Sequence, residues 1–170
     1  MIKKVKKFKF LQLNKIEKSD NKQLINLILR ENPEAILASL SPKNISSYLH
    51  NLINSENLFL FVLKKKNTII AYAVVAKQIN FLTSIFSNMK LRIFLDLVMR
   101  LKLIKIMNMI LSYFKLDMIF LNKEKKKIIN KNYNLNLLAV KKKFQSKGIG
   151  SYFLKKIFKK IKKSKFITVE

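Results

Sequence analysis

The stretch LLAVKKKFQSKGIGSYFLKKI, residues 137–157, decides how this chain folds. An apolar run ends at Val140, a lysine-rich loop follows, and residues 145–150 lead into apolar positions that recur at helical spacing. A loop that enters a helix presents unpaired backbone N–H groups and the positive end of the helix dipole. Gly148 and Gly150, the two glycines of the chain, allow an anion to come close to that backbone. The stretch therefore predicts a strand, a loop and a helix that together bind an anion.

The N-terminal part of the chain predicts one strand and two helices. Residues 8–13 alternate in hydrophobicity as a strand does, and Asp20 is the expected N-cap of the first helix. Ser41 followed by Pro42 is a stronger start signal, because an N-cap side chain then precedes a proline at the first helical position.

The middle and the end of the chain predict four more strands. Two apolar runs on either side of the polar segment Lys64–Thr68 indicate a β-hairpin. Residues 133–140 and 165–170 each indicate a strand, with a helix over 148–163 between them. The expected fold class is α/β, with the order β-α-α-β-β-insertion-β-α-β in a single domain over residues 1–170.

Residues 80–130 form an apolar-rich, lysine-bearing insertion. No uncharged apolar run within it reaches the roughly 18 residues that a membrane-spanning helix needs. Two interpretations remain open. The insertion is either a helical hairpin packed on the domain, or residues 90–116 form a basic amphipathic helix that lies on an anionic membrane surface.

The formal net charge of +27 invites a nucleic-acid interpretation, but the kind of basic residue argues against it. Lysine supplies nearly all of the charge, and the arginines are Arg30, Arg92 and Arg100. Sequence-specific recognition favours arginine, whose planar fork binds bases and phosphates bidentately. We therefore do not expect sequence-specific nucleic-acid binding, although so positive a field attracts any polyanion, RNA, anionic lipid surfaces and CoA alike.

Cysteine and histidine usage excludes several kinds of chemistry. The chain has no cysteine and one histidine, His50, which rules out disulfides, cysteine nucleophiles, cysteine-ligated metal sites and a histidine cluster, and no metal site is expected. The basic N-terminus lacks the apolar region and cleavage site of a secretory signal, which makes the cytoplasm the expected location.

The motif at residues 138–150 resembles the signature of the GNAT (GCN5-related) N-acetyltransferases. That signature is Gln/Arg-x-x-Gly-x-Gly/Ala after a strand ending in Leu/Cys-Ala-Val, and this chain carries Leu138-Ala139-Val140 and then QSKGIG at 145–150. The glycine patterns of the Rossmann and Walker loops do not match. The order of the elements is also similar, and the insertion alone falls outside the resemblance.

The resemblance implies a mixed, mostly antiparallel sheet flanked by helices, with a helical insertion between the third and fourth strands. It also implies acetyl-CoA as co-substrate. The backbone near Leu138 would hold the thioester carbonyl, Val140 would pair with the pantetheine, and the N–H groups of the loop, with Ser151, would bind the pyrophosphate. The implied acetyl-CoA-binding residues are Leu138, Ala139, Val140, Gln145, Ser146, Lys147, Gly148, Ile149, Gly150 and Ser151.

The chain departs from the family pattern at three points. Asn134 occupies the position of a carboxylate that often serves as general base, and an amide cannot take a proton usefully. Ala71 replaces a glycine common in the third strand, and we expect this change to be harmless. Family members also continue with a helix and two strands beyond the position of Glu170, so the C-terminal strands are expected to be absent here. A fragment, a truncated reading frame and a homodimer that completes the fold all remain open.

The function expected from the sequence is acetyl-CoA-dependent N-acetylation of an unidentified amine acceptor, with catalytic residues unknown. Two alternatives remain open: a non-catalytic basic protein that binds a membrane surface or nucleic acid, and a degenerate GNAT fragment that binds CoA without turnover. The simplest alternative for the motif itself is a glycine-containing turn with no ligand.

Overall fold

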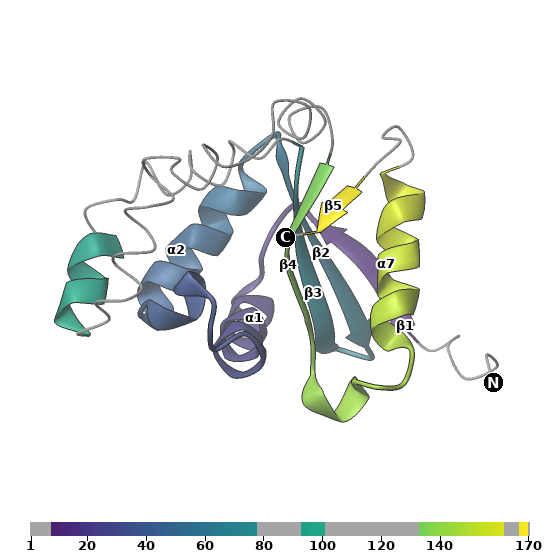
Figure 1. Cartoon of the computed structure of the whole chain (residues 1–170), viewed down its shortest axis with the longest axis horizontal. Coiled ribbons are helices and arrows are strands. Elements are labelled where there is room, and N and C mark those ends of the chain that lie inside the picture. Colours follow the sequence, from purple (N-terminus) through teal and green to yellow (C-terminus); the bar gives the residue numbers. More distant parts are fainter. Residues whose placement is uncertain (1–7, 78–92, 101–132, 162–166, 170) are drawn as a thin grey trace.

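The described part of the computed structural model, residues 8–77, 93–100, 133–161 and 167–169, forms a five-stranded sheet with helices on both faces (Figure 1). The strand order is β1-β2-β3-β4-β5, antiparallel throughout except that β5 runs parallel to β4. The strands are β1 (Phe8–Leu13), β2 (Leu58–Lys65), β3 (Thr68–Ala76), β4 (Tyr133–Val140) and β5 (Ile167–Val169). The helices are α1 (Lys18–Glu31), η2 (Ile36–Ser39), α2 (Pro42–Ile53), η3 (Lys142–Phe144) and α7 (Ile149–Lys160).

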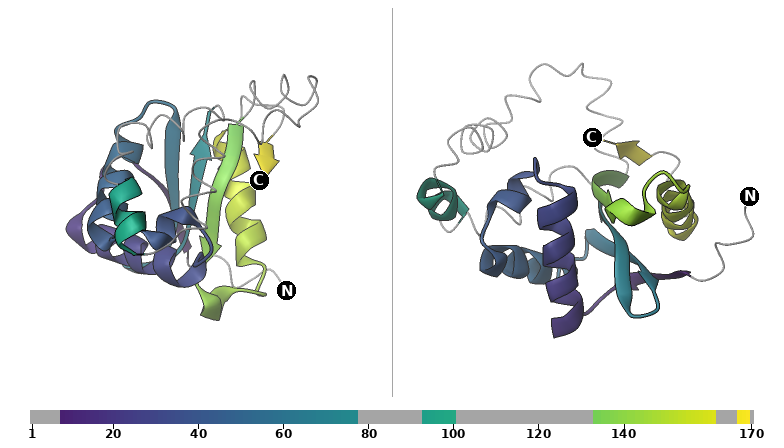
Figure 2. Two further views of the ribbon diagram at one scale, coloured as in Figure 1. Left: turned by 60° about the vertical axis from the view of Figure 1, so that its left-hand side comes forward. Right: turned by 90° about the horizontal axis from the view of Figure 1, so that it is seen from below.

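Two apolar layers hold the sheet between its helices. Because successive side chains of a strand point to opposite faces, each strand contributes to both layers. On one face, α1 and α2 pack over Leu60, Tyr72 and Ala139, and on the other α7 packs over Phe61 and Ala73 (Figure 2). β3 lies between both layers and is buried from Ile69 to Ala76, as expected for a strand covered on both faces.

The sequence predicted the order of these elements, and two helix starts show where local signals succeed and fail. Ser41 is the N-cap of α2, and its hydroxyl accepts a hydrogen bond from the Asn44 N–H at 3.4 Å. Asp20 is not an N-cap: α1 begins at Lys18, after Glu17. Asp20 lies inside the first turn, where its buried carboxylate binds the Lys64 ammonium at 2.7 and 2.8 Å. A long-range ion pair therefore competes with capping for this side chain.

The hairpin turn is shorter than the polar segment Lys64–Thr68 that predicted it. Lys64 and Lys65 still pair with β3, so only Lys66 and Asn67 connect the strands. Lys66 adopts a left-handed backbone with φ of 54°, which is the geometry that two-residue hairpin turns require. The Gln23 side chain of α1 fixes the turn by accepting from the Ile69 N–H at 2.8 Å and donating to the Asn67 carbonyl at 3.1 Å.

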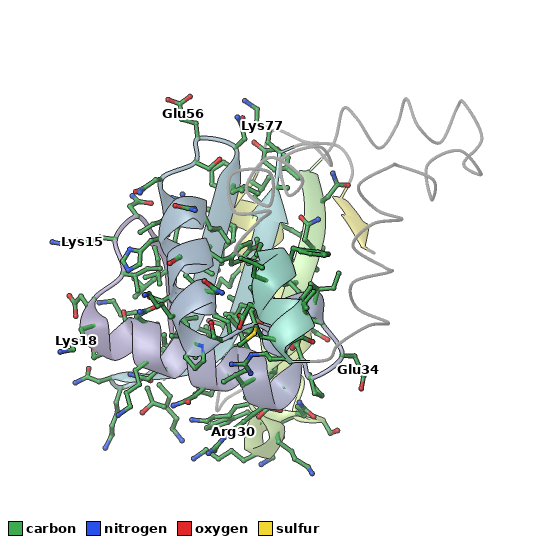
Figure 3. The ribbon with its side chains drawn as sticks, turned by 90° about the vertical axis from the view of Figure 1, so that its left-hand side faces the viewer. Lys15, Lys18, Arg30, Glu34, Glu56 and Lys77 are labelled. Carbon is green, nitrogen blue, oxygen red and sulfur yellow. The ribbon has the colours of Figure 1, made fainter. Side chains whose placement is uncertain are left out.

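Of the insertion, the structure describes residues 93–100, in which 93–99 form a short helix beside α2 (Figure 1). Ile93 and Leu97 are buried, whereas four large apolar side chains are exposed: Phe94, Leu95, Val98 and Met99. Figure 3 looks onto this side of the molecule and shows acidic Glu34 and Glu56 among its charged side chains. The other residues of both the predicted hairpin and the predicted membrane helix at 90–116 lie outside the described residues, so contact with a membrane stays a prediction. Within the described ranges, no helix is long and apolar enough to cross a bilayer.

Asp96 attaches this short helix to the N-terminus of α2. Its Oδ2 atom accepts from the Ser41 N–H at 2.5 Å and from the Asn44 side chain at 2.9 Å, and Oδ1 accepts from Arg100 at 3.2 Å. Partial burial alone would raise the pKa of Asp96, but these hydrogen bonds outweigh it and hold the pKa below the ordinary value of 3.8. The ionised carboxylate is therefore the form that docks the insertion on α2.

We expect acid to weaken this docking. A carboxyl whose pKa is lowered by folding adds stability above its unfolded pKa, and that stability is lost as the pH falls through the folded pKa. Amide hydrogen exchange at residues 93–100 should therefore accelerate below about pH 4 in the wild-type protein. In Asp96→Asn the exchange should already be fast at neutral pH and change little with acid. Equal acid sensitivity in both proteins would show that another group controls the docking.

Candidate functional site

The junction between β4 and α7 is built from two left-handed backbone positions in a lysine-rich loop. After Val140 the hydrogen bonding between β3 and β4 continues for one bond, from the Lys141 N–H to the Ile70 carbonyl at 2.8 Å. η3 then turns the chain. Ser146 has φ of 55°, and Gly148, the N-cap of α7, has φ of 69°. Backbone that alternates in this way turns successive N–H groups inward and forms concavities suited to anions.

A survey of the loop's N–H groups separates those that are occupied from those that are open. The Phe144 N–H donates to Lys141 at 2.7 Å and the Gln145 N–H donates to Lys142 at 3.1 Å, so both have partners. The first bond of α7 runs from the Tyr152 N–H to the Gly148 carbonyl. Among the described residues, the N–H groups of 146–151 have no acceptor, as expected before the first turn of a helix is complete. The predicted pyrophosphate donors are therefore open from Ser146 onward, whereas that of Gln145 is already used.

Positive charge surrounds these open donors. The side chains of Lys142, Lys143 and Lys147 are exposed around the loop. Lys143 and Lys65 both place their ammonium groups over the Phe144 ring, at 5.4 and 5.5 Å from its centre. Together with the N-terminus of α7, these side chains give the junction a positive field that favours a polyanionic ligand.

Glu31, the last residue of α1, braces the loop, and the sequence analysis did not identify it. Its carboxylate accepts from the Lys142 N–H at 3.1 Å and from the Gln145 side chain at 3.3 Å. The same Gln145 amide donates to the Val140 carbonyl at 2.6 Å. The glutamine of the motif therefore links the end of β4 to α1. The sequence contained one signal for this role of Glu31. An acidic residue at a helix C-terminus interacts unfavourably with the helix dipole, which indicates that it has a compensating partner.

We expect Glu31→Ala to loosen the loop without unfolding the domain. The amide of Lys142 should lose its protection from hydrogen exchange, and affinity for acetyl-CoA, the ligand that the motif predicts, should fall about fivefold, the effect of one lost hydrogen bond. Glu31→Gln keeps an acceptor for the Lys142 N–H and should retain most of the protection. Unchanged exchange at Lys142 in Glu31→Ala would mean that Glu31 does not brace the loop.

β4 presents an open backbone edge next to this loop. β5 pairs only with Tyr133, Asn134 and Leu135, and no described residue pairs with positions 136–140 on that side. On the other side residues 137–140 pair with β3, and Asn136 falls in a bulge between the partners of Val74 and Val75. The side chains predicted at the site pack inward: Ala139 lies in the layer under α1 and α2, and Leu138 and Val140 pack on the layer under α7. Only their backbone is placed to bind a ligand, as an added strand would.

Within the described residues, β4 carries no carboxylate or histidine that could act as a general base. Asn134, where the family often has a carboxylate, is fully buried opposite Ala76. Burial raises the pKa of both Tyr48 and Tyr72, and for Tyr48 the neighbouring Tyr72 raises it further. Both phenols therefore keep their protons at physiological pH and cannot accept one from a substrate.

Comparison with known proteins supports the fold. No protein-family model and no curated protein sequence matches the chain. Among solved structures, a GNAT family acetyltransferase of Staphylococcus aureus is similar with a TM-score of 0.52 and 16% identity, over 96% of this chain and 86% of that one. PH1933 of Pyrococcus horikoshii is similar with a TM-score of 0.52 and 16% identity, over 95% of this chain and 76% of that one. The aminoglycoside acetyltransferase meta-AAC0020 from an uncultured soil metagenomic sample has a TM-score of 0.50 and 17% identity, over 98% of this chain and 78% of that one.

These similarities show that the chain has the fold of the GNAT acetyltransferases, as the motif at residues 138–150 predicted. At these identities the likeness establishes the fold, and the chemistry rests on the residues of the junction.

Gly150 provides a test of whether the junction binds a ligand at all. A Cβ atom added there would meet only Val140 Cγ2, at 3.8 Å, which is an ordinary contact. The chain itself therefore does not require glycine at this position, and a ligand close to the backbone would. Gly150→Ala should stabilise the ligand-free protein by about 0.5–1 kcal/mol, because glycine is unfavourable in a helix. The same methyl group should weaken acetyl-CoA binding about tenfold or more. Isothermal titration and urea unfolding measure the two effects separately, and unchanged affinity would count against a ligand at Gly150.

Proposed function

We propose that the chain is an acetyl-CoA-dependent N-acetyltransferase, with acetyl-CoA bound along the open edge of β4 and at the N-terminus of α7. The observation that carries the proposal is the set of open N–H groups at residues 146–151, placed directly after an unpaired strand edge. A diphosphate bound to these groups would continue into a pantetheine chain that pairs with residues 138–140. The solved acetyltransferases that share the fold support this assignment.

The reaction would be direct transfer of the acetyl group to an amine. The nitrogen lone pair attacks the thioester carbon, a C–N bond forms and the C–S bond breaks. The amine loses one proton, the departing sulfur gains one, and the products are an N-acetyl amide and the free thiol of CoA. Backbone N–H groups of β4 near Leu138 would stabilise the negative oxygen that develops during attack. Because no described carboxylate or histidine takes the amine's proton, we propose that a neutral amine is the form that reacts.

The charge of the chain limits the kind of acceptor. A net charge of +27 repels polycations and favours acceptors that are neutral or acidic overall. We propose such an amine as the acceptor. The aminoglycoside activity of meta-AAC0020 belongs to that protein, and aminoglycosides are themselves polycations.

A second candidate function is binding of acetyl-CoA without turnover. The observation that favours it is Asn134, a fully buried amide at the position of the family's general base. Release of free thiol separates the two functions, since only an acetyltransferase releases CoA faster when an amine is added. Sustained amine-dependent release would exclude the non-catalytic candidate.

Thermal unfolding with acetyl-CoA, ADP and inorganic polyphosphate tests the binding site directly. A ligand at about one hundred times its dissociation constant adds roughly 2.7 kcal/mol to the free energy of unfolding. For a domain of this size the midpoint should rise by roughly 5–10 °C. A rise specific to acetyl-CoA supports the proposal. Equal rises with all three ligands would instead indicate a basic surface that binds any polyanion.

A further inference from the structure

Asn136 is an unusual residue in β4, because a buried polar atom coincides there with an irregularity of the sheet. Leu135 and Leu137 pair with Val75 and Val74, which leaves Asn136 as the extra residue of the bulge. Its Oδ1 atom is buried and has no hydrogen-bond partner in the described part of the chain. A buried acceptor without a donor is costly, so a native protein that keeps one has a structural or functional reason for it.

The position of Asn136 along β4 indicates which group could supply that donor. The proposed order from the loop toward β5 is pyrophosphate at residues 146–151, pantetheine at Val140 and the thioester near Leu138. Asn136 comes two residues further, roughly 7 Å along the strand. The next residue, Leu135, already pairs with β5. In this proposed order Asn136 would lie past the acetyl group, on the side away from the phosphates, where the acceptor would approach the thioester.

We propose that Asn136 positions the acceptor amine: its Oδ1 atom, which is closed to solvent in the ligand-free protein, becomes exposed when the acceptor binds and accepts a hydrogen bond from the amine N–H. This inference rests on the proposed function and adds a residue that selects and orients the acceptor. An amide oxygen cannot remove the proton, so Asn136 is a positioning residue and not a general base. A hydrogen bond through one N–H leaves the nitrogen lone pair available to attack the thioester carbon. A site built around such an acceptor rejects analogues that lack the N–H, because the oxygen is then left unpaired again.

The test compares Asn136→Leu with Asn26→Leu, which changes an exposed asparagine of α1. Glucosamine and an acidic peptide with a free N-terminus are the acceptor probes, spermidine is the polycation expected to react poorly, and release of CoA thiol is the readout. For the probe that wild type uses best, Asn136→Leu should lower kcat/KM at least about tenfold, mainly through KM for the amine. The dissociation constant for acetyl-CoA should stay within about twofold, because the phosphate and pantetheine contacts are unchanged.

A second readout distinguishes this role from a structural one. Removing an unpaired buried oxygen should leave the ligand-free protein as stable as wild type or more stable. A less stable Asn136→Leu protein that also binds acetyl-CoA poorly would show that the side chain is structural, and the proposal would then be overturned. Asn136→Ala covers the case in which leucine does not fit, with the same expected loss of kcat/KM. Unchanged kcat/KM in either folded variant overturns the inference alone, whereas a wild-type protein that releases no thiol with any probe overturns the proposed function and this inference together.

Discussion

Lys64→Met should reduce the free energy of unfolding by about 3 kcal/mol, the low end of the effect expected when one partner of a buried ion pair is removed. Lys64 and Asp20 meet at 2.7 and 2.8 Å, and 17% and 7% of their side chains are exposed. Without the ammonium group, the Asp20 carboxylate stays buried between α1 and β2 with its charge unpaired. Urea unfolding followed by circular dichroism measures the loss.

Two further variants separate the effect of breaking the Asp20–Lys64 ion pair from the general effect of replacing a lysine. Lys22→Met removes an exposed lysine of α1 and should change stability by less than about 0.5 kcal/mol. Asp20→Asn/Lys64→Met removes both charges and should recover part of the loss, because no unpaired ion remains buried. If Lys64→Met proved as stable as Lys22→Met, the pair would be a surface interaction with little effect on folding.

Elements of this fold that depend on neighbouring residues could be predicted from the sequence. Ser41 and Pro42 fix the start of α2 through contacts within one turn. The pair Gly148 and Gly150 located the loop before α7, since the ability of Gly148 to adopt a left-handed backbone is a property of the residue itself. The spacing of apolar residues then separated strands from helices. Apolar residues on one face of a strand recur every two residues, and those on one face of a helix recur about every 3.6 residues.

Features that depend on distant residues could not be predicted in this way. Asp20 looked like an N-cap because nothing near it in the sequence shows that Lys64, 44 residues away, will meet it. Glu31 contacts the Lys142 N–H across 111 residues of sequence, so its bracing role arises only when β4 joins the sheet. The bulge at Asn136 has the same origin, since register is a property of two strands and not of one. The motif therefore located the candidate site, whereas the groups that shape it came from tertiary structure.

Gly148→Asp should abolish acetyl-CoA binding at any practical concentration, with a loss of affinity of roughly two to three orders of magnitude. Two unit charges about 4 Å apart repel by about 4 kcal/mol at the effective dielectric constant typical of a protein surface. The new carboxylate would lie at the N-terminus of α7, beside the N–H groups proposed to hold the diphosphate. It could also accept hydrogen bonds from those groups and so occupy the site itself.

Gly148→Asn is the matched control for this charge. Asparagine has nearly the same shape as aspartate and tolerates the left-handed backbone better than most residues, and no atom lies within 4 Å of the added Cβ. Both variants should therefore carry a similar small backbone cost, while only aspartate repels the ligand. Titration calorimetry with acetyl-CoA should show an affinity for Gly148→Asn within about tenfold of wild type. If both variants lost binding equally, the loss would come from the changed backbone conformation at residue 148 and not from repulsion between the new carboxylate and the diphosphate. If both bound as wild type does, the diphosphate would have to lie elsewhere on the chain.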